Sequence, residues 1–331
     1  MEKFEDVRDI KWNESVHGKV FETPDLETLV TLSFNGKTIW TDDTLPKKVL
    51  EYGKIPPLGI YDLHKKGYTG ERVNVAIIDQ PLALDHPEYK GKIASYKIFA
   101  PENYEMDVSS MHGPAVTSLL VGEKLGTAPK AKVYYYAVPT WLLDSLYPAQ
   151  ALEDIIEINK SLSEKDKIKF VSVSAAHSGA YSPFKKNLKA WEQAVVNAEN
   201  EGICVVECSE GKRFASAGYI DYFSKEFKYG FPNRPMYRAQ VGNVHVPNSL
   251  RTVAESYDNK NFLYAYNGVG GLSWGIPYAT GVLCLGQQVN PKLTAFELRD
   301  LLIETAQTNK CVIDPNGFIE KVKEKSKSRE L

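Results

Sequence analysis

The chain has 331 residues, enough for one large α/β domain or for two ordinary domains. Hydrophobic residues make up 43% of it and charged residues 25%, which is typical of a soluble globular protein. The formal net charge of −2 at pH 7 gives no reason to expect a nucleic acid or an acidic membrane as partner, and no apolar stretch approaches the roughly 18 residues of a membrane span.

The start of the chain and its cysteines indicate the compartment. Residues 1–9 are charged throughout their length and contain no apolar core, so they do not form a secretory signal. Cys204, Cys208 and Cys284 lie in apolar runs, which favours reduced thiols in a core, and Cys311 follows a polar stretch without an assigned role. We therefore expect a cytoplasmic protein.

Residues 1–45 differ in pattern from the rest and are predicted to form a β-rich extension. Two short apolar runs, at 29–34 and 37–40, flank Asn35 and Gly36. Asn-Gly between two such runs predicts a β-hairpin. The extension is a small appendage, a cover on the main domain or a pro-segment, and the sequence leaves these three interpretations open.

Residues 46–315 are predicted to form the main domain. Short apolar runs, predicted to be strands buried on both faces, occur at 73–79, 131–138, 169–174 and 203–208. Helical patterns lie between them, at 113–121, 149–162 and 187–201. Alternating strands and helices predict a mainly parallel sheet with helices on both faces.

The last third of the chain is less regular. Residues 212–268 are rich in aromatic residues, Asn, Gly and Pro without clean periodicity, which favours surface loops around a site. Thr294 and Glu297 form a capping box that opens a helix ending near residue 306. Residues 316–331 are predicted to be a charged tail that buries little and frays.

Three separated residues have the contexts that a nucleophilic site requires. Asp79 ends an apolar strand, while His112 and Ser273 each stand at the start of a helix rich in small residues. A serine needs a base to take its proton, and the base needs a carboxylate to orient it. Since sites in parallel sheets lie at the carboxyl ends of the strands, we expect Asp79 to orient His112 and His112 to activate Ser273. Taken one at a time, each residue also fits an ordinary capping role.

Other chemistries fit the sequence less well. Residues 271–275 (GLSWG) match the nucleophile elbow of α/β-hydrolases, but that fold needs a histidine after the serine and no histidine follows Ser273. No His/Cys cluster has zinc spacing, and no Gly-rich phosphate loop is present. We therefore expect no metal and no cofactor, and the sequence does not indicate a structural calcium ion.

Four blocks in order resemble those of the subtilisin-like serine peptidases. They are residues 75–79 (VAIID) followed by 85–93 (DHPEYKGKI), residues 112–116 (HGPAV), residues 126–131 (GTAPKA), and residues 271–273 (GLS) with Pro277. The similarity spans about residues 58–306. It implies a subtilisin-like three-layer α/β fold, with a mainly parallel β-sheet flanked by helices, and a serine endopeptidase with Asp79, His112 and Ser273 as its catalytic triad.

The same resemblance implies further site residues. Residues 170–176 resemble the strand that pairs with an extended substrate, so Ser174, Ala175 and Ala176 are expected to bind it. The family usually has an oxyanion-hole Asn after the next apolar strand, and here Ser209 takes that position with a shorter donor. Other departures, which remove no triad atom, are Gln80-Pro81, Pro114 and Tyr278.

The expected partner is a peptide or protein substrate, with no nucleic acid and no membrane. The sequence does not give the oligomeric state. Two alternatives to a general peptidase remain open. The first is a catalytically weak or inactive subtilisin-fold protein that binds peptides or regulates, and the second is a processing enzyme dedicated to one substrate.

Overall fold

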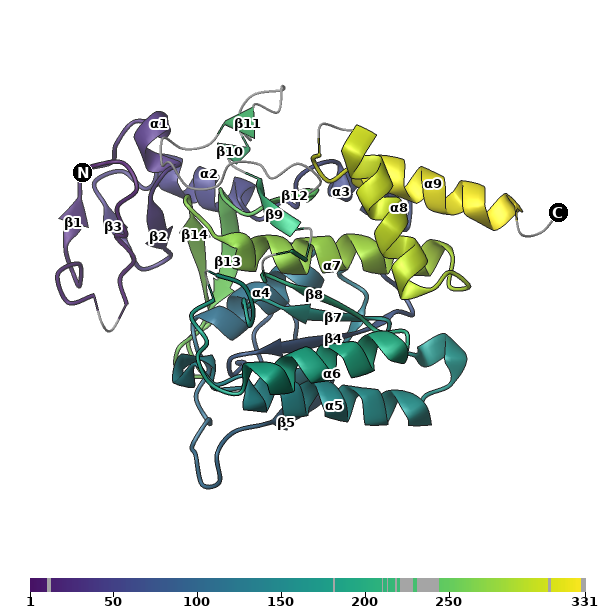
Figure 1. Cartoon of the computed structure of the whole chain (residues 1–331). Coiled ribbons are helices and arrows are strands. Elements are labelled where there is room, and N and C mark those ends of the chain that lie inside the picture. Colours follow the sequence, from purple (N-terminus) through teal and green to yellow (C-terminus); the bar gives the residue numbers. More distant parts are fainter. Residues whose placement is uncertain are drawn as a thin grey trace.

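The computed structural model describes residues 1–10, 13–180, 182–209, 211–212, 214–217, 219–220, 229–230, 244–308 and 311–328 (Figure 1). A parallel sheet of five strands lies at its centre, in the order β5-β6-β4-β7-β8. The strands are β4 (Asn74–Asp79), β5 (Ile93–Ile98), β6 (Lys132–Ala137), β7 (Phe170–Val173) and β8 (Cys204–Glu207). The prediction of strands in the four apolar runs is confirmed. The sequence reading missed β5, an edge strand whose side chains are half-buried or exposed.

Strand β4 shows why its sequence is apolar at successive positions. Val75 and Ile77 pack into a core on one face of the sheet, and Ala76 and Ile78 pack into a second core on the other face. Successive side chains of a strand point to opposite faces, so a central strand covered on both sides needs apolar residues at every position.

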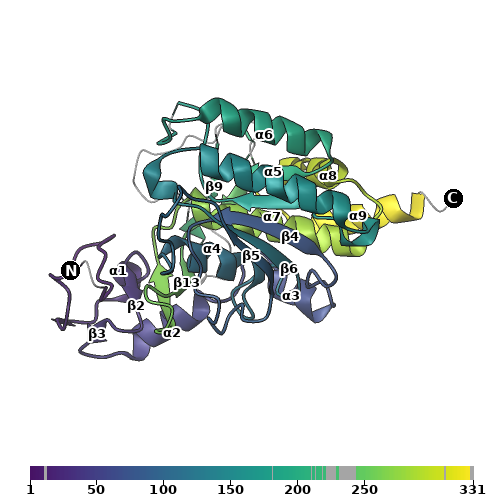
Figure 2. The same ribbon diagram turned by 90° about the horizontal axis from the view of Figure 1, so that it is seen from below.

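Helices cover both faces of the sheet and make the fold a three-layer α/β architecture (Figures 1 and 2). The helices of one face are α4 (His112–Val121) and α7 (Leu272–Val289), and those of the other are α5 (Leu146–Ser161) and α6 (Leu188–Asn200). Short 3₁₀ helices cover Thr140–Leu142 and Glu164–Asp166. The predicted fold class is confirmed. Within the described ranges, no helix is long and apolar enough to cross a membrane.

Helix α7 is the central helix of its layer. Every residue from Trp274 to Gln287 is buried. A Cβ atom on Gly275 would lie 2.4 Å from Cγ2 of Val246, and one on Gly281 would lie 2.5 Å from Cβ of Thr127. The small residues of this helix therefore permit close packing, which holds its first turn firmly.

Residues 212–268 form strands as well as loops. Strands β13 (Arg251–Glu255) and β14 (Leu263–Asn267) pair antiparallel, and every residue of β13 is buried. Shorter pairs are β9 (Phe214–Ala217) with β12 (Val244–Pro247) and β10 (Tyr219–Ile220) with β11 (Tyr229–Gly230). The prediction of surface loops is therefore wrong for β12 and β13. Both are buried by packing against distant helices, which leaves no periodic pattern in the sequence. Part of this stretch, 221–228 and 231–243, lies outside the described residues.

The predicted hairpin at Asn35-Gly36 is wrong. Strand β2 (Ser33–Asn35) pairs antiparallel with β14, whereas β3 (Ile39–Trp40) pairs parallel with β1 (Val20–Phe21). Phe34 packs on Tyr266 of β14, with ring centroids 5.1 Å apart. Strand β14 thus provides β2 with backbone hydrogen bonds and with an aromatic partner for Phe34. A local hairpin would not provide that partner.

The amino-terminal extension packs against the β13–β14 pair: its strand β2 pairs with β14, and helix α2 (Thr44–Tyr52) contacts both strands. Its helices are α1 (Leu26–Leu29) and α2, and α3 (Ile60–Lys65) follows. Because α2 runs across residues 45 and 46, the predicted domain boundary falls inside a helix. Leu29, Leu32 and Phe34 of the extension form an apolar cluster together with Leu250 and Tyr266 of the main domain.

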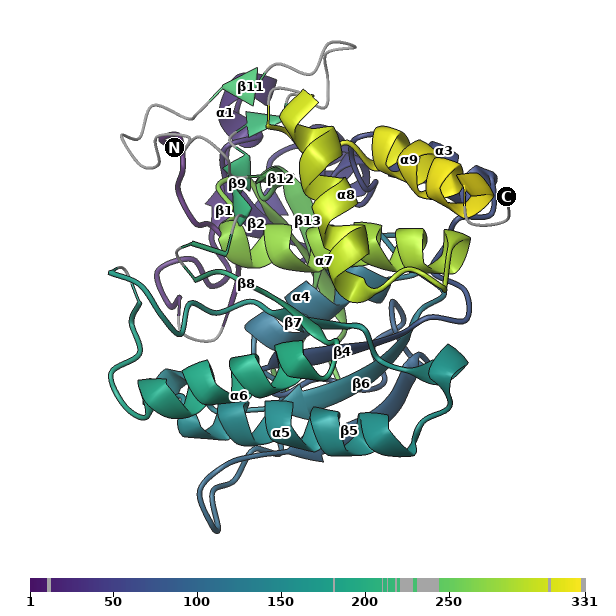
Figure 3. The ribbon, with the colours of Figure 1, turned by 45° about the vertical axis from the view of Figure 1, so that its right-hand side comes forward.

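The predicted frayed tail is instead a packed helix. Helix α8 (Ala295–Thr308) begins at the predicted capping box, and α9 (Pro315–Ser328) follows it against α7 (Figure 3). Phe318, Ile319 and Val322 of α9 are buried in the main core. Three apolar residues at helical spacing suffice to bury one face, although the rest of the segment is charged.

Candidate active site

Asp79 is the last residue of β4, and its carboxylate is 2% exposed. Its Oδ1 atom accepts a hydrogen bond from Nδ1 of His112 at 2.7 Å and another from the backbone N–H of Gln80 at 2.8 Å. Two donors on one oxygen compensate for burial of the carboxylate and fix its direction.

His112 is the first residue of α4. The hydroxyl oxygen of Ser110 accepts from the backbone N–H groups of His112 and Gly113, each at 3.1 Å, and so caps the helix. A Cβ atom on Gly113 would lie 2.4 Å from the carbonyl oxygen of Gln80, so only glycine permits this close approach. The helix start is thus held against the residues that follow Asp79. The sequence reading missed Ser110, whose signal was a serine just before the helix.

The charge of Asp79 determines the basicity of His112. Burial lowers the pKa of the imidazole, but the charge of Asp79 and the hydrogen bond to it outweigh burial, so the pKa is raised above its usual value of 6.5. The bond to Asp79 uses Nδ1, which leaves Nε2 to take a proton from a nucleophile. The imidazole is 19% exposed, and its ring centroid lies 5.3 Å from that of Trp274.

Ser273 is the second residue of α7 and precedes Trp274, the neighbour of the His112 ring. Its hydroxyl donates to the carbonyl oxygen of Ser174 at 3.1 Å, and its own carbonyl accepts from the hydroxyl of Ser174 at 2.9 Å. The second bond has a clear origin in Pro277. A helix carbonyl normally accepts from the N–H four residues later, and Pro277 has none, so Ser174 supplies the missing donor.

Ser174, Ala175 and Ala176, the predicted substrate residues, follow β7. Ser174 is bonded to Ser273 as described. The carbonyl of Ala175 accepts from the backbone N–H of Cys208 at 3.1 Å, which continues the pairing of β7 with β8 beyond the strands. The carbonyl of Ala176 accepts from the hydroxyl of Ser182 at 2.7 Å. The structure therefore brings the end of β7 directly beside Ser273.

Ser209 lies at the end of β8 but does not fit its predicted role. Its hydroxyl donates to Oε2 of Glu207 at 2.5 Å and accepts from the backbone N–H of Ser178 at 3.2 Å. The side chain is 2% exposed. A hydroxyl can donate one hydrogen bond, and Ser209 donates its bond to Glu207. In this arrangement Ser209 therefore has no hydrogen bond left to donate to an oxyanion.

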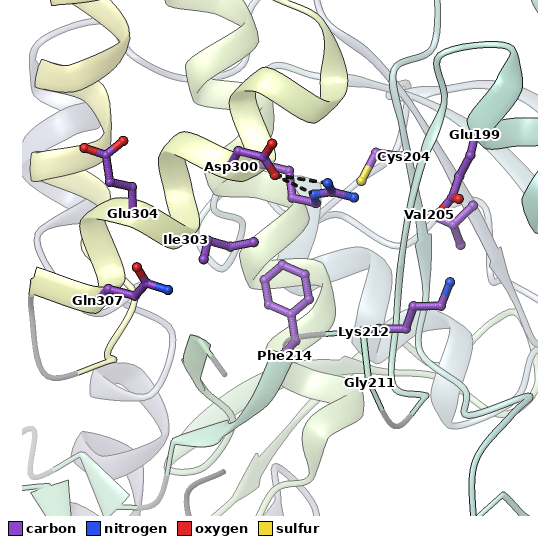
Figure 4. Close-up of a pocket in the computed structure, with 11 residues that line it drawn as sticks. Glu199, Cys204, Val205, Gly211, Lys212, Phe214, Asp300, Ile303, Glu304 and Gln307 are labelled. Atoms are coloured by element: carbon purple, nitrogen blue, oxygen red, sulfur yellow. Dashed lines mark hydrogen bonds and ion pairs between the residues drawn. The ribbon is translucent and has the colours of Figure 1, made fainter. Parts of the chain in front are cut away.

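A metal site and a further cavity are the other features to place relative to Asp79, His112 and Ser273. Among the described residues, no group of three or more His, Cys, Asp or Glu side chains is placed to hold a metal ion. A cavity of about 560 Å³ lies between α6, β8, α8 and the segment around Lys212 (Figure 4). It is lined by Glu199, Cys204, Val205, Gly211, Lys212, Phe214, Arg299, Asp300, Ile303, Glu304 and Gln307. These residues do not include Asp79, His112 or Ser273, so the cavity is separate from the triad.

Comparison with known proteins shows which family the chain resembles. The sequence model of the subtilase family matches residues 70–228. Subtilisin NAT of Bacillus subtilis subsp. natto is 26% identical over 271 residues, which are 77% of this chain and 67% of that protein. The chain is therefore similar to the subtilases, both in this family match and in its curated relatives. These similarities indicate a serine-type endopeptidase of the hydrolase class.

Solved structures show the same fold. The subtilase cytotoxin SubAB aligns with a TM-score of 0.58 at 15% identity, over 82% of this chain and 97% of that chain. The PatG macrocyclase in complex with peptide aligns with a TM-score of 0.53 at 15% identity, over 81% of this chain and 96% of that chain. These structures show that the chain has a subtilisin-like fold.

Proposed function

We propose that this protein cleaves peptide bonds by attack of Ser273, with His112 as general base and Asp79 as the carboxylate that orients it. The observation that carries the proposal is the 2.7 Å bond between Asp79 and Nδ1 of His112 at the start of α4. It leaves Nε2 as the basic nitrogen, and the His112 ring packs on the residue next to Ser273.

The reaction begins when the Ser273 hydroxyl leaves the carbonyl of Ser174 and donates to Nε2 of His112, a change of side-chain rotamer. The serine oxygen then attacks the carbonyl carbon of the substrate while His112 takes the proton. The charge of Asp79 stabilises the imidazolium that forms. His112 returns the proton to the leaving amine, and water releases the acyl group by the same route in reverse.

Negative charge on the substrate oxygen needs donors that point at it. The first N–H groups of a helix have no partner within the helix, and Ser273 is the second residue of α7. We assign its backbone N–H, together with the positive end of the α7 dipole, to stabilisation of the oxyanion. Ser209 is left out of this role because its proton is held by Glu207.

The substrate of this proposal is an extended peptide that lies along residues 174–176. The family relation supports a peptide or protein substrate, and the PatG macrocyclase has been determined in complex with a peptide. We further propose that the enzyme acts in the cytoplasm, without a metal or cofactor, on one dedicated peptide or protein. The four cysteines are free thiols, which supports a reducing compartment.

A fluorophosphonate probe tests the triad directly, because it reacts only with an activated serine. We expect the wild-type protein to be labelled at Ser273, as shown by peptide mapping, and to hydrolyse peptides. Ser273→Ala is expected to abolish both, while Ser161→Ala, at an exposed helix end, serves as the matched control and keeps both. Labelling elsewhere, or wild-type turnover by Ser273→Ala, would refute the assignment.

A further inference from the structure

One buried carboxylate near the site has no part in this chemistry. Glu207 ends β8 and is 1% exposed. Side chains alternate along β8, so Cys204 and Val206 face the core on the α7 side, while Val205 faces the opposite core. Glu207 is two residues after Val205 and therefore lies on the same face of β8. Its side chain points toward α6, where the carboxylate accepts a hydrogen bond from the indole of Trp191. Acidic side chains are seldom fully buried unless hydrogen bonds or ion pairs offset the cost of their desolvation.

We propose that Glu207 is a positioning residue that ties the end of β8 to the end of β7 and thereby holds Ser273 ready for attack. This inference rests on the proposed function of Ser273. Two segments are involved, the β7 loop, which is residues 174–178, and the β8 loop, which is residues 208–209.

The carboxylate of Glu207 joins three parts of the fold. Its Oε2 atom accepts from Nε1 of Trp191 on α6 at 3.2 Å and from the hydroxyl of Ser209 at 2.5 Å. The Ser209 oxygen accepts in turn from the backbone N–H of Ser178 at 3.2 Å. Glu207 therefore connects α6, the β8 loop and the far end of the β7 loop through a continuous chain of hydrogen bonds.

The near end of the β7 loop reaches the nucleophile. Ser174 exchanges two hydrogen bonds with Ser273, at 3.1 and 2.9 Å. Between the two ends, the backbone N–H of Cys208 donates to the carbonyl of Ala175 at 3.1 Å. A shift of the β8 loop would therefore be transmitted to Ser174 and to the nucleophile bonded to it.

Packing supports the same connection. Trp191 is 1% exposed, and its ring lies 4.5 Å from that of His177, a residue of the β7 loop. Lys212 forms an ion pair with Glu207, with its Nζ 3.5 Å from Oε1. Lys212 also lines the cavity beside α8 (Figure 4). Burial raises the pKa of Glu207 above its usual value, because it outweighs the hydrogen bonds from Ser209 and Trp191 and the charge of Lys212, which lower the pKa.

The test separates the acceptor role of Glu207 from its bulk. Glu207→Gln keeps an oxygen for Trp191 and Ser209, whereas Glu207→Leu keeps the volume and removes both acceptors. We expect Glu207→Leu to lower kcat about 10- to 100-fold with KM changed less than about threefold, because misplacement of reacting groups acts on turnover. Glu207→Gln is expected to stay within about threefold of wild-type kcat. The substrate is a fluorogenic peptide selected from a library with the wild-type enzyme, and kcat is referred to sites titrated by fluorophosphonate.

Glu88→Leu is the matched control. Glu88 is another buried carboxylate, 2% exposed, that accepts from the backbone N–H of Lys124 and the hydroxyl of Tyr264, residues outside the β7 and β8 loops. We expect this variant to lose stability as Glu207→Leu does and to keep wild-type kcat per titrated site. A fall in kcat equal to that of Glu207→Leu would show that loss of any buried carboxylate slows turnover, and would overturn the inference.

Ser209→Ala keeps the inference testable if Glu207→Leu does not fold. If Ser209 acts through Glu207, Ser209→Ala lowers kcat by itself, and unchanged kcat in Ser209→Ala would overturn the inference. Where Glu207→Leu does fold, the double variant of Glu207→Leu with Ser209→Ala should lose less than the product of the two single losses. Independent, multiplicative effects would mean that Ser209 acts by itself, which would overturn the chain of contacts. Wild-type kcat in Glu207→Leu would also overturn it. By contrast, wild-type protein without labelling at Ser273 would refute the proposed function itself.

Discussion

The bond between Ser174 and the carbonyl of Ser273 makes a sharp prediction about Pro277. Pro277 deprives that carbonyl of its helical donor, and the hydroxyl of Ser174 replaces it at 2.9 Å. Ser174→Ala should leave the carbonyl without a donor. Leaving a buried acceptor unpaired costs about 1–3 kcal/mol, and since Ser273 is only half-buried we expect a loss of about 1–2 kcal/mol in the free energy of unfolding.

Restoring the helical donor should remove most of that loss. Pro277→Ala supplies an N–H four residues after Ser273, so the carbonyl no longer depends on Ser174. In the Pro277→Ala background, Ser174→Ala is therefore expected to cost less than about 0.5 kcal/mol, giving a coupling of about 1 kcal/mol between the two positions.

Urea unfolding of the four proteins, followed by tryptophan fluorescence, measures this cycle. All four should carry Ser273→Ala, which prevents self-digestion and keeps the carbonyl in question. The parallel measurement is kcat for Ser174→Ala with Ser273 intact, which should fall because Ser273 loses a bond that holds its backbone. An equal loss of stability from Ser174→Ala in both backgrounds would refute the reasoning, since it would mean that Pro277 does not create the need for Ser174.

Three further predictions concern the base, the helix that carries it and the carboxyl-terminal helix. Because Asp79 raises the pKa of His112 and the base must be neutral, kcat/KM should fall as pH drops through an inflection above 6.5, and a flat profile from pH 5 to 8 would exclude His112 as base. Gly113→Ala should lower kcat, since its Cβ atom would lie 2.4 Å from the Gln80 carbonyl; unchanged kcat would show that α4 can move without displacing His112. Phe318→Ala should cost about 3–5 kcal/mol in urea unfolding with kcat unchanged, and a cost below about 1 kcal/mol would restore the frayed-tail interpretation.

The parts of the site that could be predicted are those encoded by adjacent residues. Asp79 at the end of an apolar run, and His112 and Ser273 at the starts of helices, are local patterns, and a strand end or a helix start has the same geometry in any fold. The capping box at Thr294 was predictable for the same reason and is confirmed by its reciprocal hydrogen bonds.

The failures occurred where a residue's role depends on a distant partner. Nothing near Asn35 indicates that its strand would pair with β14, more than two hundred residues later. Ser209 aligned with a donor position, but its hydroxyl donates its hydrogen bond to Glu207. The Glu207 side chain reaches Ser209 only because its face of β8 packs on α6. The apolar residues of α9 were too few, among its many charges, to predict a buried helix from the sequence. They are buried because α9 packs against α7.

The sequence by itself determined the α/β fold class, the four buried strands and the capping box of α8, and it placed Asp79 at a strand end and His112 and Ser273 at helix starts. All of these follow from periodicity and from order along the chain. Only the tertiary structure decided that Pro277 makes Ser273 depend on Ser174, that Ser110 and Gly113 hold His112 on Asp79, and that Glu207 takes the proton of Ser209. The physical reason is that hydrogen bonds and close packing join atoms by distance in space, and that distance is settled only when sheet and helices have packed.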